Sequence, residues 1–288
     1  SVDPSRTLDA SRDPLKNAET MRGMSLLFPQ MLDLNHSYVD QTTGRKVYGK
    51  DQGLTSLMRI VRANAYVRSG KPAYAFIEIE EARRLNPNWD EIWIQRGIAL
   101  EDILLFKQGM SDEVRKALFD EALTSFQKAM ELNPLNPVAL TRFANHVVSF
   151  RYENKDDLEK AIAISQRALD LGWVTSETYL TLGRAFFHLA VLIKRNAEDA
   201  KKNCNAAIEA LDNAIRLNDN NGYSYYVRGM AYYNLSILES DSNEKINYRK
   251  KAIEDLEIAE QKGMSLDSIP SQLKLQMGRN SEQSKSSL

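Results

Sequence analysis

Alanines recur in pairs along the chain, and each pair marks a helix with one small apolar face. Two alanines stand seven residues apart, with apolar residues between them, at Ala75–Ala82, Ala122–Ala129, Ala161–Ala168, Ala207–Ala214 and Ala252–Ala259. Seven residues make about two helical turns, so both alanines of a pair share a side of the helix. Each pair is preceded by another helical segment with its own small residue, at Ala63, Gly97, Ala144, Gly183 and Gly229. The pattern predicts five helical hairpins.

The spacing between hairpins is constant. From the second alanine of one unit to the small residue of the next there are 15 positions in all four cases, as between Ala82 and Gly97 or between Ala214 and Gly229. A fixed interval predicts that every unit stacks on its neighbour in the same geometry. Two helices approach closely only where small side chains meet, so these glycines and alanines are expected at the helix crossings. We expect the aromatic residues Trp93, Phe126, Tyr179 and Tyr225 to pack in the core between hairpins.

The distance inside each unit varies. From the small residue to the first alanine there are 12, 25, 17, 24 and 23 positions. The surplus in units two, four and five carries apolar residues at helical spacing, so it predicts elongated hairpins, with the extra length divided between both helices. Two interpretations of the longer hairpins remain open. They add stability through longer packing, or they form a ridge that serves as a second contact surface.

The same residues resemble the tetratricopeptide repeat, whose 34-residue motif combines aromatic, glycine, alanine and proline positions. The first unit fits without insertion, at Ala63, Tyr66, Gly70, Ala75, Ile79, Ala82 and Pro87. The third unit departs from the motif, because Trp173 stands where the proline is expected. The resemblance covers about residues 56–264. It implies an all-α fold, a right-handed α-α superhelix built from antiparallel helix hairpins.

The domain organisation follows from these repeats. We expect an N-terminal extension over 1–54, with a capping helix from Leu15 to Leu34 and a loop from Asn35 to Gly53. The solenoid is expected over 55–264, and a C-terminal cap with a disordered tail over 265–288. The five repeats are placed at about 56–88, 89–136, 137–174, 175–221 and 222–264. Solenoid ends need polar covers, which is the reason to expect caps.

The resemblance also implies a binding surface, because the first helices of such hairpins line a concave groove that holds partner peptides. By register, the lining residues proposed for binding are Asn64, Arg68, Gln95, Arg142, Asn145, Arg184, His188, Tyr223, Tyr226 and Tyr233. Amides can bond an extended backbone, arginines can pair with carboxylates, and tyrosines can bury an apolar anchor. Some relatives clamp acidic chaperone tails, but here Ile60 and Val138 replace both clamping lysines, which argues against that ligand. A solvated groove with partners docking elsewhere is the alternative.

Composition excludes several classes of function. The 38 basic and 39 acidic residues give a net charge of −1, so nucleic acid is not expected as a partner. The apolar runs are too short to insert into a membrane. Cys204 is the single cysteine, which excludes an internal disulfide. The three histidines are scattered without ligand spacing, so we expect no metal, no cofactor and no catalysis.

These observations favour a protein-interaction scaffold or adaptor that binds a peptide or partner segment in the groove. The alternative is a non-catalytic sensor or interaction region of a larger signalling or membrane-anchored assembly protein. Because the sequence begins at Ser1, a processed form or an excised piece is expected, and the compartment stays open between cytoplasm and export. Self-association through the elongated hairpins is a further expectation.

Overall fold

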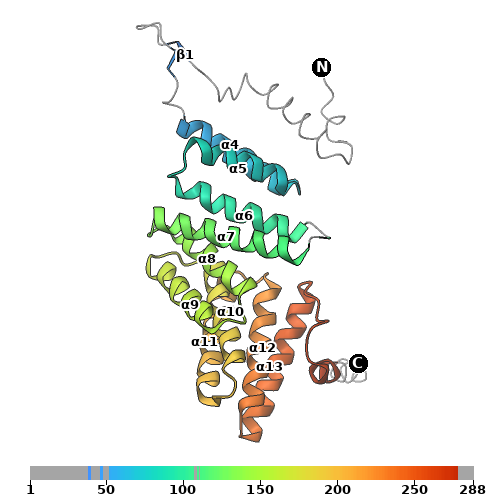
Figure 1. Ribbon diagram of the computed structural model, residues 1–288. Coiled ribbons are helices and arrows are strands. Elements are labelled where there is room, and N and C mark those ends of the chain that lie inside the picture. The colour runs from blue at the N-terminus through green and yellow to red at the C-terminus, as the bar shows by residue number, and fades with distance from the viewer. Residues whose placement is uncertain (1–37, 40–45, 48–51, 107–108, 110, 278–288) are drawn as a thin grey trace, which may run out of the picture. The chain divides into compact units, whose positions relative to one another are not determined.

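The computed structural model describes residues 38–39, 46–47, 52–106, 109 and 111–277. Within them, helices alternate in five antiparallel hairpins, which confirms the all-α prediction (Figure 1). The hairpins pair α4 (Gln52–Arg68) with α5 (Pro72–Leu85), α6 (Asp90–Phe106) with α7 (Asp112–Leu132), α8 (Pro137–Phe150) with α9 (Lys155–Asp170), α10 (Ser176–Leu192) with α11 (Ala197–Leu217), and α12 (Gly222–Leu238) with α13 (Ser242–Gln261). A further short helix spans residues 271–277.

The chain divides into two compact units, Ser1–Asn133 and Pro134–Leu288. In the described part of the first unit, the hairpin of α4 and α5 stacks on that of α6 and α7, with α5 against α6. In the second unit, α9 packs against α10 and α11 packs against α12, so that three hairpins form a continuous stack. The first helices α8, α10 and α12 also contact one another in sequence. We call their shared surface the first-helix face.

The predicted loop at 35–53 needs a correction. It contains a two-stranded antiparallel ladder in which β1 (Tyr38–Val39) pairs with β2 (Lys46–Val47), and α4 already begins at Gln52. Each strand has only two residues, which is too short for an alternating apolar pattern to predict it. The predicted capping helix at 15–34 lies outside the described residues, and so do residues 278–288 of the region predicted to hold the C-terminal cap and tail.

Small residues stand at the helix crossings, as the spacing predicts. All ten paired alanines have no solvent exposure. A Cβ added to Gly97 would lie 2.4 Å from Cε1 of Phe126, and one added to Gly183 would lie 2.6 Å from Cγ of Leu211. Such distances are below van der Waals contact, so only glycine permits these two helix pairs to approach this closely.

Asparagine begins most helices of the second unit. Asn136 Oδ1 accepts hydrogen bonds from the backbone N–H groups of Val138 and Ala139 at 2.9 and 3.3 Å, and Pro137 occupies the first turn of α8. Asn154, Asn196 and Asn221 cap α9, α11 and α12 in the same way. These caps satisfy amide groups that have no partner within the helix, and they fix where each helix starts.

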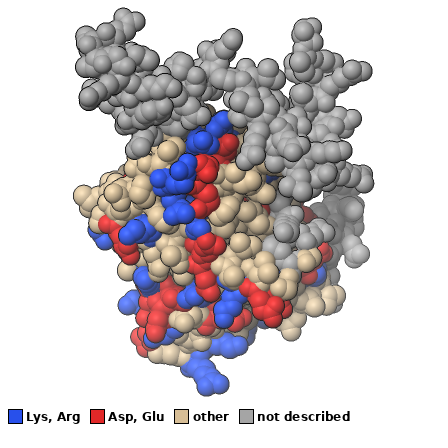
Figure 2. Space-filling model, turned by 45° about the horizontal axis from the view of Figure 1, so that its top comes forward, with Lys and Arg blue, Asp and Glu red and all other residues tan. Residues whose placement is uncertain are grey.

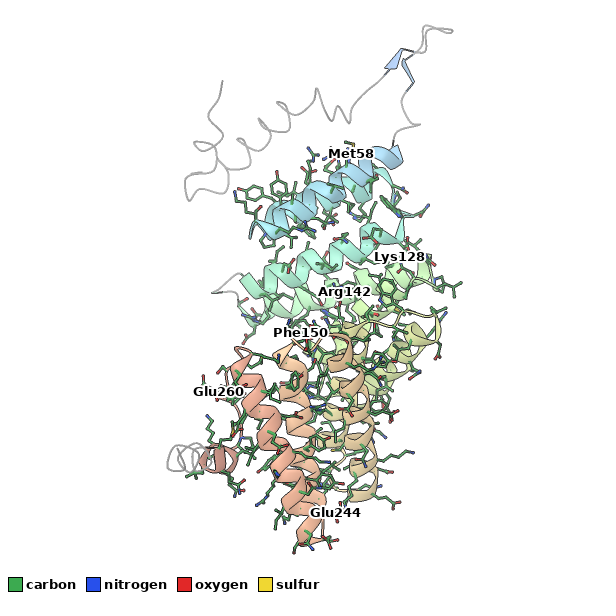
Figure 3. All side chains as sticks on the ribbon, turned by 180° about the vertical axis from the view of Figure 1, so that it is seen from behind. Met58, Lys128, Arg142, Phe150, Glu244 and Glu260 are labelled. Carbon is green, nitrogen blue, oxygen red and sulfur yellow. The ribbon has the colours of Figure 1, made fainter. Side chains whose placement is uncertain are left out.

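The structure contains the three elongated hairpins that the sequence predicts. In the second unit, α8 and α9 have 14 and 16 residues, whereas α10 and α11 have 17 and 21, and α12 and α13 have 17 and 20. The extra length therefore falls more on the second helix than an even division predicts. Glu244, at the start of α13, marks the projecting end of the last hairpin, far from Glu260 at the other end (Figure 3).

Only one of the four aromatic residues expected in the core is fully enclosed. Phe126 has no solvent exposure, but Trp93, Tyr179 and Tyr225 are half-buried at the junctions between hairpins. The indole Nε1–H of Trp93 donates a hydrogen bond of 2.7 Å to the carbonyl oxygen of Pro87. Tryptophan and tyrosine carry a polar group that needs a partner, so they settle at the edge of an apolar layer rather than inside it.

Candidate partner-binding surface

The ten residues proposed for binding fall into two sets, one in each unit. Asn64, Arg68 and Gln95 belong to the first unit, where Asn64 and Gln95 are half-buried and Arg68 is exposed at the end of α4. Gln95 Nε2 donates a hydrogen bond of 2.8 Å to Glu91 Oε1 on its own helix. The other seven residues lie on α8, α10 and α12 of the second unit.

Arg184 joins the three helices of the first-helix face. From α10, its Nη1 donates to Asn145 Oδ1 at 2.8 Å and its Nη2 donates to Ser149 Oγ at 3.2 Å, both on α8. Its guanidinium carbon lies 5.3 Å from the ring centre of Tyr223 on α12, a cation–π arrangement. The structure therefore brings together Asn145, Arg184 and Tyr223, which are 39 positions apart in sequence at each step.

The positive charge of Arg184 has no negative partner in the described part of the chain. Both hydrogen-bond acceptors are neutral oxygens, and its Nε is buried without a hydrogen bond. Among the residues that the structure describes, no carboxylate forms an ion pair with it. Arg142, also on this face, differs because its Nη1 lies 3.0 Å from Glu177 Oε1. A half-buried, uncompensated guanidinium is costly, and an anion placed beside it would remove that cost.

His188 lies one helical turn beyond Arg184 in an aromatic setting. Its ring stacks on Tyr152 at 5.0 Å between centres and meets Phe187 edge-on at 5.4 Å. Burial, together with the charge of Arg184, lowers the pKa of His188 from 6.5 to about 4. The imidazole is therefore neutral near pH 7, so it adds hydrogen-bonding capacity without adding charge. We call Asn145, Ser149, Arg184, His188 and Tyr223 the Arg184 cluster.

The tyrosines of α12 behave in two different ways. Tyr223 and Tyr226 stack with ring centres 6.0 Å apart and planes 11° apart, and Tyr226 Oη is 3.1 Å from Ser268 Oγ. Tyr233 is buried, in one apolar cluster with Ile253 and Leu273. Tyr233 is therefore covered in this structure rather than open on the first-helix face, and its role in binding stays a prediction. The segment after α13, including residues 271–277, covers the part of α12 where Tyr233 lies, and it falls within 265–288, where the sequence predicts a C-terminal cap.

Two contributors to the site were missed by register. Tyr152 lies in the turn after α8, where the repeat motif assigns no position, yet it forms one wall beside His188. Ser268 follows the last repeat and meets Tyr226. Neither residue has a signal in the repeat pattern. An aromatic or hydroxyl side chain beside a turn is too common a feature to identify a site.

Two kinds of chemical group bear on catalysis among the described residues, metal-ligand clusters and the single thiol. No group of three or more His, Cys, Asp or Glu side chains there is placed to hold a metal ion. Burial raises the pKa of the Cys204 thiol to about 12, so the thiol stays protonated and is a poor nucleophile. None of the described helices combines the length and the hydropathy that crossing a bilayer requires.

On the face drawn in Figure 2, basic and acidic side chains are interspersed rather than gathered into a field of one sign. Several exposed pairs neutralise each other locally, for example Lys128 with Glu131 at 2.9 Å and Lys155 with Glu159 at 3.4 Å. The described part of this face therefore carries no broad field of one sign.

The chain is similar in structure to several helical proteins, although no family model and no curated protein matches it. A crystal structure of MamA is 21% identical over 76% of this chain and 100% of that one, with a TM-score of 0.49. YrrB, described as a TPR protein with an unusual peptide-binding site, is 16% identical over 72% and 90%, with a TM-score of 0.47. TTC0263, a thermophilic TPR protein from Thermus thermophilus, is 16% identical over 72% and 96%, also with a TM-score of 0.47.

Proposed function

We propose that this chain is a non-catalytic protein-interaction scaffold whose Arg184 cluster binds an acidic group on a segment of a partner protein. The observation that carries the proposal is the uncompensated charge of Arg184. Its side chain is held by Asn145, Ser149 and Tyr223, none of which bears a negative charge. A half-buried cation without a negative partner does not stabilise the fold. Because its side chain is held rigidly, it is well placed to bind the carboxylate of a partner.

The surroundings of Arg184 favour a peptide over a small metabolite. Asn145 offers an amide that can bond a peptide backbone, and the stacked pair Tyr223 and Tyr226 offers rigid ring surface at low entropic cost. His188, neutral near pH 7, adds a further hydrogen-bonding group one turn away. These groups extend along and across three helices rather than closing around one point. An extended segment can use all of them, with a carboxylate side chain or a C-terminal carboxylate at Arg184.

Affinity capture from the native source tests this proposal. The wild-type chain and the Arg184→Gln variant would be immobilised and the captured proteins compared, with Arg195→Gln as a matched control because Arg195 is exposed at the turn between α10 and α11. We expect at least one protein to be captured by the wild type and the control but lost from the Arg184 variant. Circular dichroism establishes that all three chains are equally helical. Identical sets of captured proteins would reject the site.

Self-association is a second candidate, favoured by apolar residues on the projecting ends of the elongated hairpins. Ile237 and Ile246 are 55% and 66% exposed at the end of α12 and the start of α13. Exposed aliphatic side chains of this size favour contact with another apolar surface. Light scattering at two concentrations tests it. A mass that rises with concentration and becomes constant in Ile237→Lys/Ile246→Lys would support self-association, and a constant wild-type mass would exclude it.

A further inference from the structure

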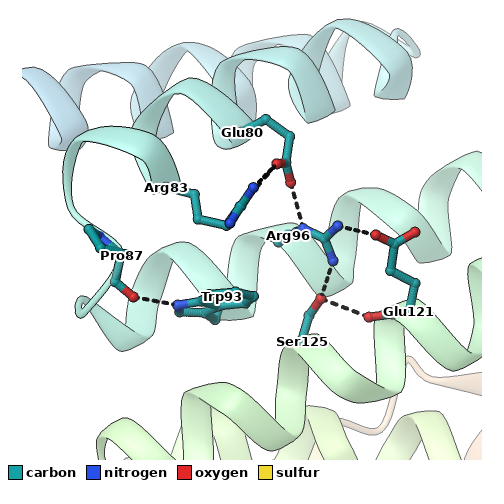
Figure 4. Close-up of polar contacts among 7 residues, drawn as sticks. All are labelled: Glu80, Arg83, Pro87, Trp93, Arg96, Glu121 and Ser125. Carbon is teal, nitrogen blue, oxygen red and sulfur yellow. Dashed lines mark hydrogen bonds and ion pairs between the residues drawn. The ribbon is translucent and has the colours of Figure 1, made fainter.

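An arginine ties three helices together at one junction of each unit. In the first unit, Arg96 on α6 donates through Nε to Glu80 Oε1 on α5 at 2.5 Å and through Nη1 to Ser125 Oγ on α7 at 2.7 Å. Its Nη2 also bonds Glu121 (Figure 4). The guanidinium lies 6.0 Å from the ring centre of Trp93. The Arg96 side chain is only 10% exposed, so the charge is buried but satisfied on every side.

Arg228 likewise connects three helices, at the junction of α11, α12 and α13. It donates through Nε and Nη2 to the Asp255 carboxylate at 2.8 and 2.6 Å, and through Nη1 to Asp212 Oδ1 at 2.6 Å. Its guanidinium lies 5.4 Å from the ring centre of Tyr225. Burial alone would lower the pKa of Arg228, but the hydrogen bonds and charges of Asp255 and Asp212 raise it overall.

The two junctions use the same register. Each arginine directly precedes the glycine of its helix, and its aromatic neighbour lies three residues before it. One acceptor belongs to the preceding hairpin, where it lies two residues before the second alanine. The other acceptor belongs to the arginine's own hairpin, where it lies three residues after the first alanine. The arginine, its aromatic neighbour and these two acceptors are Arg96, Trp93, Glu80 and Ser125 at one junction and Arg228, Tyr225, Asp212 and Asp255 at the other.

The junction of α9, α10 and α11 has this register without the arginine. Leu182 stands at the arginine position, Gln166 and Ala210 stand at the acceptor positions, and Tyr179 keeps the aromatic position. All four of these residues line a cavity of about 500 Å³. The third hairpin also lacks the arginine, but there the position is filled by the buried ring of Phe143, with Lys160 Nζ 4.9 Å from its centre. Beside Leu182, by contrast, the position that the guanidinium of Arg96 or Arg228 occupies at the other junctions is part of the cavity.

The lining of this cavity suits a cation with an apolar stem. Its complete set of lining residues is Gln166, Leu169, Asp170, Val174, Tyr179, Leu182, Phe186, Ala206, Glu209, Ala210 and Asn213. Two members, Asp170 and Glu209, are carboxylates, and none is a lysine or arginine. Leu182, Phe186 and the alanines offer apolar walls, while Tyr179 offers a ring face. No described lysine or arginine lies over that ring, in contrast to Trp93 and Tyr225.

We propose that the cavity beside Leu182 binds an arginine side chain from a basic segment of a partner protein. The partner thus supplies in trans the residue that the chain supplies itself at Arg96 and Arg228. The methylene stem packs on Leu182 and Ala210, and the guanidinium stacks on Tyr179 and pairs with Asp170 or Glu209. Leu182 and Arg184 are about 200° apart around α10, so this site lies on the opposite side of that helix from the Arg184 cluster and does not depend on it.

A pair of short peptides tests the proposal by nuclear magnetic resonance of the ¹⁵N-labelled full chain. The probes are Ac-Gly-Arg-Gly-NH₂ and Ac-Gly-Lys-Gly-NH₂, which carry the same charge. We expect saturable shifts of the backbone amides of Tyr179, Leu182 and Ala210 with the arginine peptide, and affinity at least about threefold weaker for the lysine peptide, which lacks the planar fork. Equal affinity for both peptides, or shifts scattered over the surface, would overturn the proposal.

Surface variants keep the test independent of folding. Asp170 and Glu209 are exposed, so Asp170→Asn/Glu209→Gln should fold normally and weaken the arginine peptide about fivefold. The matched control Glu159→Gln/Glu254→Gln removes the same charge at exposed positions outside the cavity and should leave binding of the arginine peptide unchanged. Leu182→Arg should place a guanidinium in the cavity and abolish binding. Undiminished affinity in the Asp170/Glu209 variant, or an equal loss in the control, would contradict an arginine site here.

Discussion

Gly97 on α6 lies directly against the ring of Phe126 on α7, so closely that a Cβ on Gly97 would come within 2.4 Å of Cε1. Gly97→Ala should therefore force the ring or the helix to move and lower the free energy of unfolding by about 1–3 kcal/mol. Urea denaturation followed by circular dichroism measures this. Thr124→Ala, at an exposed position of α7, serves as the control and should change stability little.

Ala122, four residues before Phe126, marks the same crossing. It has no solvent exposure, so Ala122→Leu adds three carbons where no space exists. We expect a loss of about 1–3 kcal/mol in the free energy of unfolding, because overpacking shifts neighbouring side chains from their preferred rotamers. A denaturation midpoint equal to that of the wild type would show that Ala122 does not face a neighbouring helix.

Arg228 and Arg184 should respond differently to the same substitution. Arg228→Gln leaves the carboxylate of Asp255 buried without its cation, since that side chain is only 6% exposed, and we expect a loss of about 3–5 kcal/mol in stability. Arg184→Gln strands no carboxylate, so its cost should be smaller. Paired urea titrations compare the two variants. Equal losses would mean that Arg184 serves stability as much as Arg228 does, which weakens its assignment to ligand binding.

His188 should titrate near pH 4 because burial, and secondarily the charge of Arg184, disfavour its protonated form. Between this pKa and the value of about 6.5 in the unfolded chain, the unfolded state binds more protons. Stability should therefore fall as the pH is lowered from about 6.5 to 4, and His188→Gln should remove that part of the dependence. Imidazole proton resonances, assigned with the His188→Gln variant, report the pKa directly.

The same titration in a variant separates the two causes of the lowered His188 pKa, burial and the charge of Arg184. In Arg184→Gln the pKa of His188 should rise only part of the way toward 6.5, because burial is the larger cause and remains in place. A wild-type His188 that titrates near 6.5 would show an exposed ring and would contradict its stacking between Tyr152 and Phe187.

The repeat architecture could be predicted because it depends on intervals that survive in the sequence. The constant distance of 15 residues places Gly97 and Gly229 at crossings where the structure indeed leaves no room for a side chain. The greater share of added length in α11 and α13 could not be predicted, because apolar spacing fixes the total length of a hairpin and not where its turn lies.

The candidate site was predictable only in part. Register places Asn145, Arg184 and Tyr223 on one face, and their contacts confirm that these three meet. It also places Tyr233 there, whereas the chain after the last repeat buries it. That burial comes from the segment predicted as a C-terminal cap, which lies outside the periodic pattern, so no repeat register shows which residues it covers. The cavity beside Leu182 likewise could not be predicted from the sequence. It is recognised only by comparison with the junctions where Arg96 and Arg228 supply an arginine side chain.

The dissociation constant of a captured partner, measured for the wild type and for Arg184→Gln by calorimetry, tests the central claim most directly. If the partner's acidic group pairs with Arg184, the variant should bind at least about tenfold more weakly, while its unfolding midpoint changes little and Arg195→Gln binds like the wild type. Equal dissociation constants for the wild type and Arg184→Gln would contradict the account.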